Sequence, residues 1–164
     1  MDSIKKKYII NNLKWPISHF GYISNYFILF FPYILIYSGL EEFNEDKSAL
    51  LLIIIGIFFF IYIIYRIESE RKFKELSFNK DLSTSEIGKL LELKSGWKLI
   101  ANSSTSGIIK FNTSTSFLDQ GQTVTIIRIK KEKILINTQP NGRAVFTFFK
   151  DILNYNQIKK ILAQ

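Results

Sequence analysis

Four basic side chains lie within six residues of the chain's second half and form its strongest candidate binding site: Arg128, Lys130, Lys131 and Lys133. Cations at such short spacing can bind the phosphates of anionic phospholipid headgroups, at about 1 kcal/mol per basic residue near a membrane surface. They can equally bind an acidic protein partner. A third interpretation stays open: a solvated hairpin tip whose charges only prevent edge-to-edge strand pairing.

Catalytic chemistry has few candidate residues in this sequence. The chain has no cysteine and one histidine, so it lacks a thiol nucleophile and the ligands of a zinc site. The second half has no histidine for a nucleophile–base pair and no phosphate-binding glycine-rich loop. We therefore predict a protein that is not an enzyme and has no cofactor and no metal. Nucleic acid is not an expected partner, because no aromatic residues interleave with the basic ones.

Two polar residues, His19 and Asn25, interrupt the first of two long apolar runs. Polar groups inside a membrane are a functional hypothesis by default, here a proton or ion relay. His19 lies about one turn from the end of the run, and the second run offers no ionisable partner. We therefore favour a hydrogen bond from Asn25 across the helix pair or to a neighbouring subunit.

The apolar runs, residues 16–40 and 49–65, are both long enough for membrane-spanning helices. About 20 helical residues cross the hydrocarbon core of a bilayer. Trp15 and Tyr22 near one end of the first run, and Tyr33 and Tyr37 near the other, suit the two membrane interfaces. Pro32 is expected to kink the first helix.

Basic residues near the two runs predict the orientation of the chain. Four lysines precede the first run, one lysine among four acidic residues separates the runs, and four basic residues follow the second run. Basic residues favour the cytoplasmic side. We therefore expect a multi-pass protein of the inner (cytoplasmic) cell membrane with both termini in the cytoplasm.

These patterns divide the chain into six segments. The expected order is a basic cytoplasmic N-terminus (1–14), transmembrane helix 1 (15–40), a short acidic extracytoplasmic loop (41–47), transmembrane helix 2 (48–66), a helical stalk (67–80) and a cytoplasmic β-rich domain (81–164). The stalk rests on Glu–Lys pairs at i,i+4, Glu68 with Lys72 and Glu70 with Lys74.

Within the last segment, the sequence predicts a short helix and then a β-meander. Ser83 and Glu86 have capping-box spacing, and Gly96 is expected to end the helix. Five short β-rich segments follow, separated by turn residues: residues 97–101, 108–111, 124–130, 134–137 and 144–149. Helical spacing returns at residues 151–162. The expected fold class is a membrane α-helical hairpin plus an α+β domain, with an antiparallel meander closed by a C-terminal helix.

This arrangement resembles the small bacterial membrane proteins with a pleckstrin-homology-like domain, the YcxB-like group. The resemblance rests on GQTVTII at residues 121–127, ILINT at residues 134–138, and residues 146–158 with Asn156. It covers about half of the chain. It implies a non-enzymatic binding module of PH-like fold.

The sequence therefore favours an integral membrane protein whose basic cytoplasmic domain binds a protein partner or the anionic inner-leaflet surface. The domain carries thirteen Lys and Arg against six Asp and Glu from residue 79 onward. An alternative is a small immunity or accessory protein whose hairpin recognises a membrane-targeting toxin. A transporter or channel subunit ranks lower, because two helices per chain would need a homo-oligomer and the second run has nothing polar to line a pore.

Overall fold

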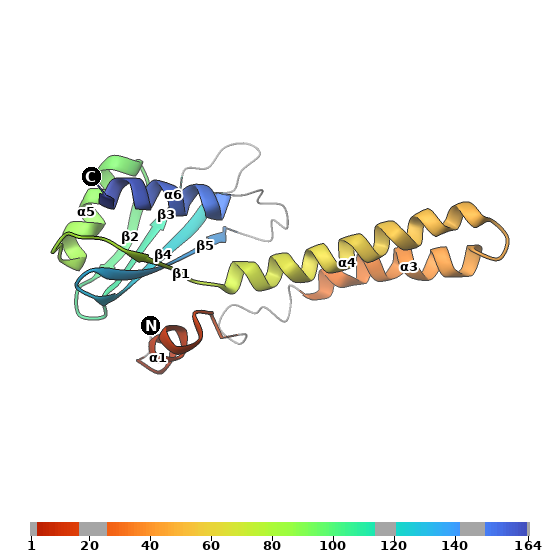
Figure 1. The fold of residues 1–164 in the computed structure, drawn as a ribbon, viewed down its shortest axis with the longest axis horizontal. Helices are drawn as coiled ribbons and strands as arrows, with labels where there is room; N and C mark the ends of the chain where they lie inside the picture. The colour runs from red at the N-terminus through yellow and green to blue at the C-terminus, as the bar shows by residue number, and fades with distance from the viewer. Residues whose placement is uncertain (1–2, 17–25, 114–120, 142–149, 164) are drawn as a thin grey trace. The chain divides into compact units, whose positions relative to one another are not determined.

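The computed structural model describes residues 3–16, 26–113, 121–141 and 150–163 of the chain (Figure 1). It divides into two compact units. One contains Met1–Pro16 together with Glu70–Gln164, and the other contains Ile17–Ser69. The N-terminal segment thus belongs to the same unit as the C-terminal half of the chain, although the two are more than fifty residues apart in sequence.

The first unit is built on an open five-stranded antiparallel sheet in the order β1-β5-β4-β3-β2. The strands are β1 (Lys74–Ser77), β2 (Lys98–Ser103), β3 (Ile108–Asn112), β4 (Gln122–Lys130) and β5 (Lys133–Pro140). The predicted strands at residues 97–101, 108–111, 124–130 and 134–137 are confirmed as β2 to β5. The predicted strand at residues 144–149 lies outside the described residues.

Two helices of this unit begin and end where local sequence signals place them. In α5 (Thr84–Ser95), the Ser83 hydroxyl accepts from the Glu86 N–H, and the Glu86 carboxylate accepts from the Ser83 N–H. Gly96 ends the helix at φ +71°, a left-handed conformation that glycine adopts without a Cβ clash. The C-terminal helix α6 (Lys150–Ala163) also matches the expected residues.

One face of the sheet forms the main hydrophobic core against α5 and α6 (Figure 1). Alternate strand residues point to this face, as the two-residue period of a strand requires. Its members from the strands are Leu76, Ile109, Phe111, Val124, Ile126, Ile134 and Ile136. The helices contribute Ile87, Leu91, Ile158, Ile161 and Leu162. The sheet and the two helices therefore form two layers that pack face to face.

The opposite face of the sheet is buried as well. Ile108, Ile127 and Leu135 alternate with the core residues, and each is at most 5% exposed. The N-terminal segment, with helix α1 (Ser3–Asn12), supplies two residues with no exposed surface, Ile9 and Trp15. The Lys6 ammonium donates to the Ser106 carbonyl oxygen beside β3. The N-terminus therefore packs against the sheet's second face, and Trp15 is not exposed as a membrane-interface residue would be.

The expected helical stalk is wrong beyond Arg71. Helix α4 (Leu50–Arg71) ends there, and the next residues form β1, the strand at one edge of the sheet. Lys74 pairs with Ile136, and Leu76 pairs with Ile134. Burial of Phe73 and Leu76 and a ladder with β5 outweigh the small stabilisation of exposed i,i+4 ion pairs, about 0.2–0.5 kcal/mol each.

The second unit contains two packed helices, α3 (Phe30–Glu42) and the first part of α4. Short 3-10 turns, Tyr26–Leu29 and Lys47–Ala49, precede them. A Cβ on Gly39 would lie 2.7 Å from Ile53 Cγ1, and a Cβ on Gly56 would lie 2.6 Å from Ile36 Cγ1. Glycine thus permits close approach of the two helices, as small residues do between membrane helices.

Pro32 is buried near the start of α3, and its carbonyl oxygen is among the atoms closest to Gly56. The 3-10 turn before α3 places the irregular backbone ahead of this proline, where its missing N–H is tolerated. Across the described residues, the fold is α+β with five antiparallel strands in an open sheet and five α-helices.

Candidate functional sites

The two segments that link the first unit to the apolar hairpin are held together by hydrogen bonds. The Trp15 N–H donates to the Arg71 carbonyl oxygen (2.9 Å), and the Phe73 N–H donates to the Leu13 carbonyl oxygen (2.7 Å). The Arg71 guanidinium, 5% exposed, donates back to the Trp15 carbonyl oxygen through Nε (3.1 Å) and Nη2 (2.9 Å). We call residues 13–16 and 70–73, with Asn137, the clasp.

Asn137 joins both segments of the clasp to the sheet. Its Oδ1 accepts from the indole Nε1 of Trp15 at 2.8 Å. Its Nδ2 donates to the carbonyl oxygens of Glu70 and Lys72, both at 2.8 Å. Asn137 lies on β5 and is 2% exposed, so these bonds satisfy polar groups that burial would otherwise penalise.

The clasp also contains an aromatic ring contact and one residue with a strained backbone conformation. The Trp15 and Phe73 rings lie 5.1 Å apart between centroids. Leu13 has φ +51°, a left-handed conformation that costs a non-glycine residue about 1–2 kcal/mol. The surrounding hydrogen bonds must offset that cost. The sequence did not predict the clasp, because nothing in the residues around Asn137 indicates a hydrogen-bond partner 122 positions away.

The predicted basic site is brought together on the β4–β5 hairpin. The register shifts between Arg128 and Lys130, which is a bulge, and Lys130 then pairs with Lys133. The Arg128 side chain donates to the carbonyl oxygens of Lys130 (3.3 Å) and Lys131 (3.1 Å). The guanidinium therefore braces the hairpin turn, in addition to carrying charge.

Carboxylates neutralise much of this basic hairpin. Asp81 lies 3.3 Å from Lys131 Nζ and 3.9 Å from the Arg128 guanidinium, and Glu75 lies 2.6 Å from Lys133 Nζ. Lys130 is exposed and has no ion pair within the described part of the chain. Of the four predicted residues, Lys130 thus has the most available charge.

The positive charge of the basic hairpin also affects the carboxyl group of Glu86, at the start of α5. Its hydrogen bonds to Ser83 hold the pKa of its carboxyl below the usual value, and Arg128 and Lys89 lower it further through their positive charge. The Glu86 carboxylate is therefore ionised at neutral pH. The local field is mixed in sign, and a partner must compete with these carboxylates for Arg128, Lys131 and Lys133.

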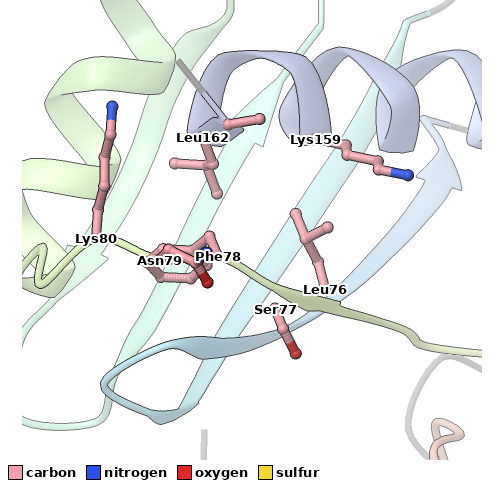
Figure 2. Close-up of a pocket in the computed structure, with 8 residues that line it drawn as sticks. Leu76, Ser77, Phe78, Asn79, Lys80, Lys159 and Leu162 are labelled. Carbon is pink, nitrogen blue, oxygen red and sulfur yellow. The ribbon is translucent and has the colours of Figure 1, made fainter.

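A cavity of about 280 Å³ lies between the end of β1 and the C-terminal end of α6 (Figure 2). Leu162 lines it from α6, and Leu76 and Phe78 line it from β1 and the residue that follows the strand. The Lys80 and Lys159 side chains extend in different directions in Figure 2, so their ammonium groups do not converge. The carbonyl end of α6 also disfavours an anion there. This cavity lacks the convergent polar groups of a small-molecule site.

The intramembrane candidates His19 and Asn25 lie outside the described residues. Among the described residues, no group of three or more His, Cys, Asp or Glu side chains could hold a metal ion. Comparisons of the chain with protein-family models, curated proteins and solved structures found no match.

Proposed function

We propose that this chain is a non-enzymatic integral membrane protein with a membrane hairpin at residues 17–69. In this proposal the α+β unit is a PH-like binding module on the cytoplasmic side, for a protein partner or the anionic inner-leaflet surface. The exposure of apolar side chains on the hairpin is the observation that carries the proposal.

Among the described helices, one is long and apolar enough to cross a membrane, Lys47–Arg71 with mean hydropathy 2.7. Only 17% of its most apolar stretch is buried. The core helix of a soluble protein would be mostly buried, whereas here Leu51, Phe58 and Ile61 are each more than 60% exposed. Burial in lipid is worth about 1.5–3 kcal/mol for each such side chain relative to water.

The neighbouring helix α3 has the same character. Phe30, Phe31, Tyr33 and Ile34 are each more than 50% exposed, although they belong to a long apolar run. Its described part is too short to span alone, so the two-pass proposal also rests on the sequence of residues 17–25. The basic residues that flank the runs favour a cytoplasmic position for both termini.

The basic hairpin is the proposed contact surface of the module. Lys130 is exposed and has no ion pair among the described residues, and the Asp81 and Glu75 ion pairs are exposed enough to be exchanged for an acidic partner. Exposed ion pairs contribute at most about 1 kcal/mol each, so such exchange has a low free-energy cost.

A deletion of the hairpin tests the membrane proposal. Residue pairing in the clasp brings residues 14 and 72 opposite one another, so a short Gly-Ser turn can join Pro16 to Glu70. We expect the full chain to stay with the membranes during alkaline extraction and the deleted chain to be soluble and folded. A soluble full chain would overturn the membrane proposal, and so would a deleted chain that resists extraction.

A fragment of residues 79–164 is the informative comparison for that deletion. It lacks β1 and the N-terminal segment, so one sheet edge and the face with Ile127 and Leu135 would be uncovered. We expect this fragment to aggregate or unfold under conditions in which the 1–16/70–164 chain is stable.

A further inference from the structure

Helix α1 has one exposed face that nothing in the structure covers within the described residues. Its exposed residues are Ser3, Ile4, Lys7, Tyr8, Asn11 and Asn12. Their spacing of three and four places them on a single side of the helix. The opposite side carries Ile9, which has no exposed surface. The helix therefore has an inner side fixed to its own unit and a free outer side.

The outer side combines apolar and basic residues. Ile4 is 81% exposed, and Tyr8, four residues later, is 40% exposed. Lys7, between them in sequence, is exposed on the same side, and Lys5 is half-buried. The polar Ser3, Asn11 and Asn12 share this side, so Ile4 and Tyr8 form a small apolar site beside a lysine. Tyrosine and lysine side chains are both common where a protein meets a membrane interface.

A short segment connects α1 to the apolar hairpin. α1 ends at Asn12, and the hairpin unit begins at Ile17. The chain from Asn12 to Ile17 can extend to at most about 18 Å. The four residues between them, 13–16, belong to the clasp, which also includes residues 70–73 that follow Ser69. Both connections to the hairpin thus leave the first unit from one place.

We propose that the outer face of α1 binds the anionic headgroup layer of the bilayer that holds the hairpin. Ile4 and the Tyr8 ring insert at the boundary of the acyl chains, and Lys7 pairs with lipid phosphates. The clasp sets the position of α1 against the sheet, so this contact limits how the module can orient on the membrane. The inference rests on the membrane location proposed above.

Single-cysteine spin labels test this inference on the full chain, because the protein has no cysteine of its own. Labels are placed at Ile4→Cys, at Leu93→Cys on α5 and at Phe58→Cys on α4. Leu93 is the matched control, because it is 84% exposed and Ile4 is 81% exposed. The protein is reconstituted in phosphatidylcholine vesicles with or without phosphatidylglycerol, and label accessibility to oxygen and to a water-soluble nickel chelate is measured.

The expected result separates the three positions. The label at position 58 favours oxygen in both vesicles, and the label at position 93 favours the nickel chelate in both. The label at position 4 moves several-fold from nickel towards oxygen only when phosphatidylglycerol is present, and Lys7→Glu in the same chain reverses this change. Lys89→Glu on α5 leaves it intact.

Each contrary result has a distinct meaning. A label at position 4 that behaves like the one at position 93 in anionic vesicles overturns the α1 contact while the membrane hairpin stands. Protection of position 4 from both reagents in either vesicle shows a protein surface on α1, which also overturns it. A nickel-accessible label at position 58 contradicts the membrane hairpin itself.

Discussion

The indole Nε1 of Trp15 lies 2.8 Å from Oδ1 of Asn137, and both side chains are almost completely buried. The same amide donates to the carbonyl oxygens of Glu70 and Lys72. One asparagine on β5 therefore connects the chain entering the apolar hairpin and the chain leaving it to the sheet.

Asn137→Ala should destabilise the first unit strongly. It leaves the Trp15 indole and the carbonyl oxygens of Glu70 and Lys72 without this partner, and each unsatisfied buried group costs about 1–3 kcal/mol. We expect a loss of about 2–4 kcal/mol in the free energy of unfolding, measured by urea denaturation of the 1–16/70–164 chain. Asn12→Ala is the control, because its side chain makes one exposed hydrogen bond to the Tyr8 carbonyl oxygen. Equal stability of the two variants would contradict the role of Asn137.

Gly56→Ala should move α3 and α4 apart. The new Cβ would lie 2.6 Å from Ile36 Cγ1 and 3.0 Å from the Pro32 carbonyl oxygen, well inside the usual carbon contact distance of about 3.5–4.0 Å. Spin labels at the exposed positions Tyr37 and Ile54 would report a longer or broader distance distribution in lipid. Ile57→Ala, at a half-exposed position on the same helix, should leave that distribution unchanged.

Acid should remove the stabilisation that the Glu86 charge provides. Because its pKa in the folded protein is below the usual 4.5, the ionised form stabilises the fold above that pH, and this stabilisation is lost as pH falls through the folded-state pKa. The difference in unfolding midpoint between the native chain and Glu86→Gln should be constant near neutral pH and shrink below about pH 4.5. A difference that grows on acidification would have the wrong sign.

A photo-crosslinking side chain at position 130 should identify what the basic hairpin contacts. In native membranes we expect a discrete protein or phospholipid adduct at this position. The same side chain at position 98, an exposed lysine on the opposite edge strand, is the control. Adding Lys133→Glu should reduce the adduct several-fold, because it removes a neighbouring positive charge. Equal labelling at positions 130 and 98 would favour the interpretation as a solvated hairpin tip.

Local signals made part of this fold predictable from sequence. The capping box of Ser83 and Glu86 and the left-handed Gly96 act within a few residues of the helix they bound. Short turns join β2 to β3 and β4 to β5, so the alternation of apolar and polar residues and the turn residues were enough to predict these strands. The basic cluster was also predictable as a group, because all four residues lie on one hairpin.

Long-range pairing made the rest unpredictable. Residues 74–77 carry helix-compatible charge spacing, and only the partner strand β5, about sixty residues later, makes them a strand. Trp15 adjoins an apolar run, so its position suggests a membrane interface until Asn137 is known to be its partner. The carboxylates of Asp81 and Glu75 likewise reach the basic hairpin only through the fold.

The most direct test of the central claim is the membrane topology of the full chain. A reporter active only in the cytoplasm is fused after Gln164 and, in a separate chain, inserted between Glu41 and Lys47. Our account predicts activity at Gln164 and none in the loop. Activity at both positions would mean that the hairpin does not cross the membrane, and activity in the loop alone would place the module on the opposite side.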